Sequence, residues 1–250
     1  MRLQRTLDEE ARLINDEILL KIGGYTPRGG GWKDGKEAIL EMRDAGFPPW
    51  KEVEWPGYYI KFIIQKAIQE GKLVGFESMA EQKHYLARGR YLWDLRATGE
   101  DVESFMLTDC ARWDTLIGQY DGIGLIVFVC RYERDKDDKF RKWHMRTGGG
   151  ESEFVRDRIA RGVPPRQRKT GFGILNSFLF YFDRQLMTRG MHEGWLAQVA
   201  TNMRNSDGSP RNPKYAFFIS EAPSDILLGA RNFNWDPKEY DEAFGDIEPL

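Results

Sequence analysis

The sequence YLWDLRA at residues 91–97 decides the fold that we expect for this chain. Its residues suit a buried β-strand, although an acid and a base interrupt the apolar run. Side chains alternate between the two faces of a strand, so Asp94 and Arg96 would share one face. One interpretation is that Asp94 belongs to a metal site. The alternative is that both charged residues lie on a solvated face or pair with neighbouring groups.

The hydrophobic pattern around residues 91–97 predicts an α/β protein with a central mixed β-sheet flanked by helices. The run IGLIVFVC at residues 123–130 is typical of a central strand buried on both faces. The expected helices cover residues 7–22 after a Thr6–Glu9 capping box, and residues 36–45, 57–70, 108–119, 151–161, 195–203 and 224–228. The expected strands cover residues 73–79, 91–97, 104–107, 123–130, 171–183 and 215–220, and the first three would form an antiparallel meander.

Composition limits the class of protein. A chain of 250 residues with 41% hydrophobic content can bury a full core, and we expect one domain over residues 1–250. Cys110 and Cys130 have no metal-like spacing, so reduced thiols are expected. The chain has neither the apolar core of a signal peptide at its start nor a run of 18 apolar residues, which predicts a soluble, cytoplasmic protein without a membrane partner.

The absence of several short motifs argues against several classes of protein. The sequence contains no GxSxG, HExxH, CxxC or GxGxxG, so serine hydrolases, zincins, zinc fingers and dinucleotide-binding enzymes have no local support. The glycine-rich residues 25–35 are predicted to form a flexible loop, because they lack the Lys-Ser/Thr ending and the preceding strand of a P-loop.

A basic stretch, residues 131–169, could bind phosphates. It holds thirteen Lys and Arg residues against seven acids, with most of the excess near its end. The candidate DNA-binding residues are Arg156, Arg158, Arg161, Arg166, Arg168, Lys169 and His144. The alternative is a solvated face of mixed charge, and for His144 a packed or hydrogen-bonded side chain.

The order of elements around residues 91–97 resembles the core of the PD-(D/E)XK nucleases, the superfamily of most type II restriction endonucleases. Glu77 lies on the strand before, and a hairpin could bring its carboxylate beside Asp94. The helix at residues 57–70 precedes these strands and the buried strand at residues 123–130 follows them. The family carries an acid on one strand and acid-x-Lys on the next, and this pattern falls on Glu77, Asp94 and Arg96.

The resemblance implies a restriction-endonuclease-like fold with its core at residues 57–169, on which residues 1–56 and 170–250 pack. It also implies Mg²⁺-dependent, sequence-specific cleavage of double-stranded DNA by a homodimer, with Glu77 and Asp94 as metal ligands and Arg96 as a third catalytic residue. Arg96 stands where the family has Lys, and a guanidinium that stays protonated would orient hydroxide or stabilise charge on the phosphate. The alternatives are a noncatalytic nucleic-acid-binding protein that uses residues 131–169, and a soluble interaction protein that binds no polyanion.

Overall fold

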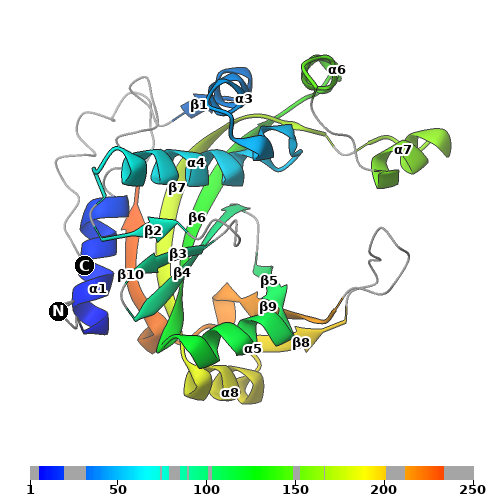
Figure 1. Cartoon of the computed structure of the whole chain (residues 1–250). Coiled ribbons are helices and arrows are strands. Elements are labelled where there is room, and N and C mark those ends of the chain that lie inside the picture. The colour runs from blue at the N-terminus through cyan, green and yellow to red at the C-terminus, as the bar shows by residue number, and fades with distance from the viewer. Residues whose placement is uncertain are drawn as a thin grey trace.

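Strand β4 lies inside a seven-stranded sheet with the order β1-β7-β6-β4-β3-β2, in which β10 also pairs with β7 (Figure 1). This computed structural model describes residues 6–19, 32–73, 75–78, 85–88, 90–100, 103–148, 153–165, 167–200 and 212–233. The strands are β1 (Trp32–Asp34), β2 (Glu77–Ser78), β3 (Tyr85–Arg88), β4 (Tyr91–Gly99), β6 (Gly122–Arg134), β7 (Lys169–Phe182) and β10 (Leu227–Asn232). The β4–β6 pair is parallel and the other pairs are antiparallel, so the predicted mixed sheet is confirmed.

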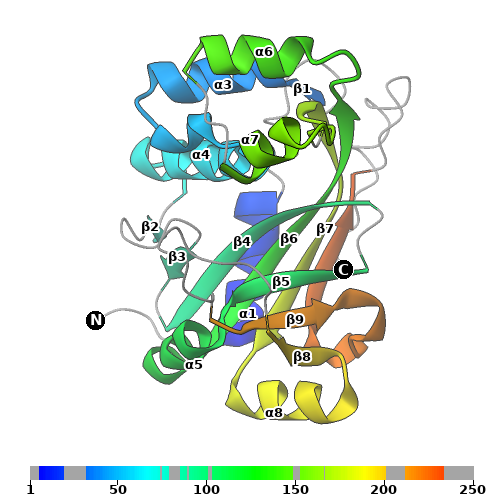
Figure 2. The same cartoon turned by 90° about the vertical axis from the view of Figure 1, so that its right-hand side faces the viewer.

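A second, three-stranded sheet has the order β5-β9-β8 and lies in front of the first in Figure 2. Its strands are β5 (Ser104–Asp109), β8 (Leu196–Val199) and β9 (Lys214–Phe218). The prediction that β5 continues the meander after β4 is wrong, because β3 and β6 already occupy both sides of β4. Instead β5 pairs with β9, where the rings of Phe105 and Phe217 lie 5.4 Å apart.

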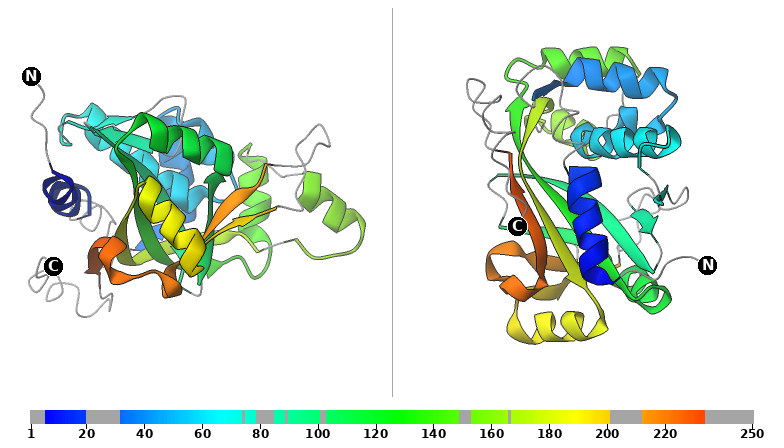
Figure 3. Two further views of the ribbon diagram at one scale, coloured as in Figure 1. Left: turned by 90° about the horizontal axis from the view of Figure 1, so that it is seen from below. Right: turned by 90° about the vertical axis from the view of Figure 1, so that its left-hand side faces the viewer.

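Helices α1 (Leu7–Leu13), α3 (Gly35–Asp44) and α4 (Trp55–Gln69) cover one face of the large sheet (Figure 3). The predicted capping box begins α1, since Thr6 Oγ1 accepts a hydrogen bond from the Glu9 amide and Glu9 accepts one from the Thr6 amide. A π-helix, η1 (Ile14–Leu19), continues α1 along the sheet. The buried side chains of these helices pack on Trp93 and Leu95 of β4.

The opposite face carries α5 (Cys110–Gln119), α8 (Arg184–Glu193) and the small sheet. Helix α5 is the crossover between β5 and β6, and it makes the parallel pairing of β4 with β6 possible. On β6, Leu125 and Val127 contribute to this second core, whereas Ile126 and Phe128 contribute to the first. The central strand is therefore buried on both faces, as its continuous apolar run predicts.

Two helices lie between the paired ends of β6 and β7, where Arg134 is in register with Lys169. They are α6 (Lys139–Arg146) and α7 (Glu153–Ala160), and both lie at the upper end of the molecule in Figure 2. Short 3₁₀ turns complete the chain as η2 (Pro48–Lys51), η3 (Ile219–Glu221) and η4 (Ser224–Ile226).

Four predicted segments differ from the structure. The strand expected at residues 73–79 is reduced to β2, Glu77–Ser78, and the helix expected at residues 224–228 is the single turn η4. Within the helix expected at residues 195–203, Leu196–Val199 form strand β8 instead, because Trp195 and Leu196 pack in the aromatic core beside Phe217, and residues 201–203 lie outside the described residues. Within the loop expected at residues 25–35, residues 32–34 form β1 and Gly35 begins α3, while residues 25–31 lie outside the described residues. Among the described helices, none has the length and apolar character needed to cross a membrane.

Candidate functional site

Strand β4 brings Asp94 and Arg96 together as an ion pair. The Arg96 Nε and one terminal nitrogen lie 3.0 and 2.8 Å from Asp94 Oδ2. The Asp94 side chain is fully buried, whereas 25% of the Arg96 side chain is exposed. Asp94 and Arg96 thus lie on one face of β4, as the alternation of side chains along a strand predicts. Of the two interpretations of these residues, the structure shows the one in which they pair with a neighbouring group.

The surroundings of Asp94 act in opposite directions on its charge. Burial is the largest effect and raises the pKa of the Asp94 carboxyl, while the charges of Arg96 and Lys61 and the Leu95 amide act to lower it. Lys61 reaches this region from α4, and its side chain is buried as well. Asp94 Oδ1 has no hydrogen-bond partner among the described residues. One oxygen of a buried carboxylate is therefore left without a donor.

Glu77 does not lie beside Asp94, contrary to the predicted hairpin. Strand β3 stands between β2 and β4, so Glu77 is in register with Ala87, and Ala87 is in register with Leu92. Neighbouring strands are about 4.8 Å apart, which places the β2 and β4 backbones roughly 10 Å apart. The Glu77 side chain is exposed. The intervening strand is the physical reason for the correction.

The described residues do not form a magnesium site around Asp94. Mg²⁺ takes six oxygen ligands in near-octahedral geometry and keeps several waters. Within the described ranges, no group of three His, Cys, Asp or Glu residues could hold a metal ion. Asp94 Oδ1 is a single candidate ligand in a fully buried position, and the other oxygen of the same carboxylate is bound by Arg96.

His144 and Arg168 are buried in the fold and are not on the surface. The carbonyl oxygen of Trp50 lies 3.0 Å from His144 Nε2, so this nitrogen carries the hydrogen. His144 Nδ1 then accepts a hydrogen bond of 2.6 Å from Arg168. Burial and the Arg168 charge lower the pKa of His144 to about 4, so its ring is neutral at pH 7. The packed, hydrogen-bonded alternative describes His144, and neither residue is placed to contact DNA.

Two further cations of the basic stretch are engaged within the protein. Lys169 forms an ion pair with Glu54 and lies 4.2 Å from the centre of the Tyr132 ring. The Arg158 guanidinium donates two hydrogen bonds to the carbonyl oxygen of Pro164. The Arg158 contact lies within the segment that joins β6 to β7, and the Lys169 contact ties the start of β7 to Glu54, the residue before α4.

Some of the exposed cations of the basic stretch lie on α6 and α7, and others, such as Arg131 and Arg134, lie on β6. Arg156 and Arg161 are exposed at α7 and its end, and Arg166 lies outside the described residues. On α6, Lys142 and Arg146 are exposed at a spacing of four residues, so they share one face of that helix. The sequence interpretation did not single out these two residues, although their helical spacing was a usable signal.

The predicted catalytic residues and the predicted DNA-binding residues thus lie in different environments. Asp94 and Arg96 form a buried pair in the sheet, whereas the exposed cations lie at the end of the β6–β7 hairpin. Comparison of the chain with known proteins found no match among family models, curated proteins or solved structures.

Proposed function

We propose that the protein is a metal-dependent endonuclease that hydrolyses phosphodiester bonds of duplex DNA. The observation that carries the proposal is the setting of Asp94 and Arg96: one face of β4, after α4 and the antiparallel strands β2 and β3, and before the α5 crossover to the parallel strand β6. This is the order of elements on which the resemblance to the PD-(D/E)XK nucleases rests. A restriction-endonuclease-like fold and sequence-specific cleavage are parts of the same proposal.

Within this proposal Arg96 stabilises negative charge and does not take up a proton. A guanidinium stays protonated at any pH at which the protein is folded, so it cannot act as a general base. Its side chain is one quarter exposed, so it can reach a phosphate that approaches this side of β4. The requirement for Mg²⁺ comes from the resemblance, and no step through the ion is derived from Asp94 alone.

The surface charge supports contact with a polyanion at one end of the molecule. Four of the exposed cations belong to α6, α7 and the turn after α7, which the β6–β7 hairpin holds in place. Phosphate contacts of this kind position a protein on DNA without reading its sequence. The homodimer is proposed on separate grounds, because two active sites related by a twofold axis would cut both strands of a symmetric site.

The test is incubation with duplex DNA of mixed sequence, with Mg²⁺ or with a chelator, followed by sequencing of the ends. We expect Mg²⁺-dependent cuts at a recurrent sequence, loss of cutting in Asp94→Asn and normal cutting in the control Asp44→Asn, whose carboxylate is exposed on the surface. Asn keeps the shape of Asp, so circular dichroism should report a folded variant. Undiminished cutting by folded Asp94→Asn, or no cuts by the wild-type protein, would contradict the proposal.

A second candidate, noncatalytic binding of nucleic acid, is favoured by one observation. Arg96 already binds the Asp94 carboxylate, and β3 separates Glu77 from Asp94. The three predicted catalytic residues are therefore not assembled, whereas binding of DNA by the exposed cations does not require them. Changing Arg156 or Lys142 to Gln should lower the log–log salt slope of DNA binding by about one unit each. The control is Arg112→Gln, an exposed arginine on α5. An unchanged slope in both variants would remove α6 and α7 from the interface.

A further inference from the structure

A row of polar side chains crosses the large sheet on the face that carries α5, α8 and the small sheet. Thr98 of β4 is in register with Val129 of β6, which is in register with Asn176 of β7. Asn176 is in turn in register with Asn232 of β10. Side chains of residues in register lie on the same face of a sheet. We call Thr98, Asn176 and Asn232 the polar row.

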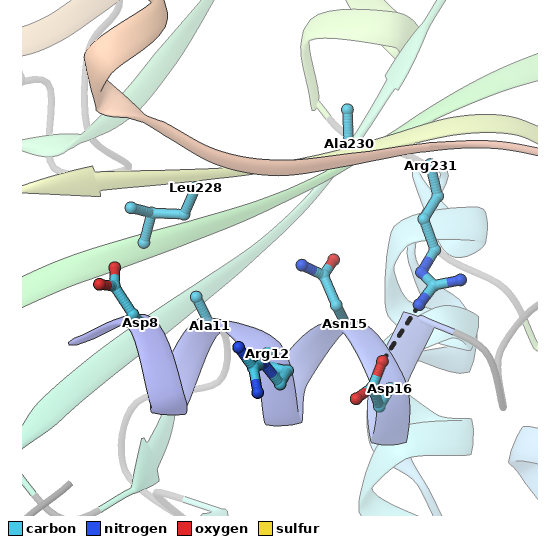
Figure 4. A pocket seen from close by; sticks show the side chains of 8 residues that line it. All are labelled: Asp8, Ala11, Arg12, Asn15, Asp16, Leu228, Ala230 and Arg231. Atoms are coloured by element: carbon cyan, nitrogen blue, oxygen red, sulfur yellow. Dashed lines mark hydrogen bonds and ion pairs between the residues drawn. The ribbon is translucent and has the colours of Figure 1, made fainter. Parts of the chain in front are cut away.

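Figure 4 shows which face of the sheet Asn232 occupies. The preceding residue, Arg231, extends toward Asp16 on the continuous helix of α1 and η1, and one of its terminal nitrogens lies 3.3 Å from Asp16 Oδ1. That helix packs on the face of the sheet that holds the core around Trp93. Because successive side chains of a strand point to opposite faces, Asn232 points away from the helix, to the same side as Asn176.

The polar row lies where this face of the sheet becomes accessible to solvent. On β6, Val127 is fully buried in the core beneath the small sheet, whereas Val129, two residues further on, is partly exposed. On β4, the Asp94 side chain is fully buried, whereas 25% of the Arg96 side chain is exposed. Figure 2 looks onto this face, with the small sheet over its lower part and α7 at its upper end. The polar row therefore begins beside the member of the ion pair that solvent reaches.

Folding alone does not account for the asparagine in β7. The strand has 14 residues and pairs with β6 on one side and with β1 and β10 on the other, a setting in which asparagine is depleted. The Asn176 side chain is partly exposed, and its amide forms no hydrogen bond with another residue in the described part of the chain. The register of β6 against β7 shifts directly after the Val129–Asn176 pair, and such irregularities redirect side chains next to functional sites.

The width of the polar row favours contact with the backbone of DNA over contact with base edges. Thr98 and Asn232 are three strand spacings apart, which is about 14 Å. The major groove of B-DNA is about 12 Å wide and admits a helix or a two-stranded ribbon, so this four-stranded face is too wide to enter it. Hydroxyl and amide side chains contact phosphate and sugar groups, and such contacts fix the position of a protein without reading the sequence.

We propose that the sugar–phosphate backbone of DNA lies across this face, with one phosphate at Arg96 and neighbouring backbone groups at Thr98 and Asn176. Arg96 and Thr98 are two residues apart on one face of β4, about 7 Å, so one DNA strand can contact both. Glu100, the next acid along β4, accepts hydrogen bonds of 3.1 and 3.0 Å from Arg131, so its negative charge is compensated at this edge. The inference rests on the proposed action on DNA and identifies the surface that holds the substrate.

The test measures binding of duplex DNA in a chelator and cleavage with Mg²⁺ separately, for Asn176→Asp and the wild-type protein. The substitution keeps the shape of the side chain but adds a negative charge, so we expect at least about tenfold weaker binding and slower cutting at unchanged sequences. The control Gln69→Glu adds the same charge at the exposed end of α4, on the opposite face, and should bind as the wild type does. Equal affinity of the two variants, or cutting at new sequences, would overturn the proposal.

A second variant, Thr98→Val, keeps the test decisive if Asn176→Asp does not fold. Valine has the shape of threonine and suits a strand, so the protein should fold and bind DNA at least about threefold more weakly through the loss of one hydrogen bond. The log–log salt slope should not change, because a hydroxyl neutralises no phosphate. Wild-type affinity in Thr98→Val would overturn the proposal.

The two measurements also separate this inference from the proposed function. Wild-type protein that binds DNA but does not cut it would contradict the nuclease, while the affinities of the variants would still decide whether DNA lies on this face. Wild-type protein that does not bind DNA would overturn both.

Discussion

Acidification from pH 7 to pH 5 should destabilise the protein through His144. The ring is fully buried, donates to the Trp50 carbonyl and accepts from Arg168, so protonation would remove the acceptor and place two positive charges together. Its pKa is lowered from 6.5 to about 4, with burial as the larger cause and the Arg168 charge as the smaller. Between these two values the unfolded chain binds a proton that the folded protein does not.

The magnitude follows from this difference in pKa. Because the pKa of the folded state is depressed, the stabilising contribution of neutral His144 is complete above pH 6.5 and decreases as the pH falls toward 4. Each pH unit within that interval changes the free energy of unfolding by about 1.4 kcal/mol. At pH 5 the loss is therefore about 2 kcal/mol, which is a large share of the 5–15 kcal/mol that is typical of a folded domain.

The assay is urea unfolding followed by tryptophan fluorescence at pH 7 and pH 5. His144→Gln keeps an acceptor and a donor but cannot titrate, so its stability should depend less on pH than that of the wild type, by about 2 kcal/mol over this interval. The matched control is His192→Gln, which removes an exposed histidine on α8 in place of the buried one. If His144→Gln and the wild-type protein lose the same free energy on acidification, the structural assignment of His144 is wrong.

Two further predictions concern the core. Gly124→Ala should destabilise the protein by about 3 kcal/mol or more in urea unfolding, because its Cβ would lie 1.9 Å from the buried Trp93 ring. The control Gly118→Ala on α5 has its nearest contact at 3.6 Å and should instead stabilise the protein by up to about 1 kcal/mol. Equal effects of the two substitutions would refute the packing of Trp93 against Gly124. Burial raises the pKa of Cys110 to about 11 and that of Cys130 to about 12, so neither thiol should react with an aromatic disulfide reagent at pH 8 until the protein unfolds, and fast native reaction would contradict their burial.

Elements set by local signals could be predicted from the sequence. The capping box fixed the start of α1, the apolar stripe of α4 fixed its buried face, and the uninterrupted run of β6 identified a strand with cores on both sides. Each of these features depends on residues close together in the chain. The paired alternative for Asp94 and Arg96 was accessible for the same reason, since the two side chains are two residues apart.

Features set by distant partners could not be predicted in this way. The distance between Glu77 and Asp94 depends on β3, a strand of four residues whose surrounding sequence is polar and shows no clear alternation. The assignment of β5 to the small sheet depends on β9, more than a hundred residues later in the chain. His144 is buried because Trp50 and Arg168 converge on it from two separate segments. Spacing within one segment carries no information about such contacts.

The buried pair of Asp94 and Arg96 on β4 is not the arrangement that stability alone would favour. Apolar side chains of similar volume in place of a buried ion pair are often neutral or stabilising, whereas removing one partner costs about 3–5 kcal/mol. Folding alone would therefore be served at least as well by apolar residues on this face of β4. Asp94 nevertheless keeps one oxygen without a donor while Arg96 remains partly exposed. Within the proposed function, the partly exposed Arg96 is the member of this pair that a phosphate would contact, and folding alone does not account for the pair.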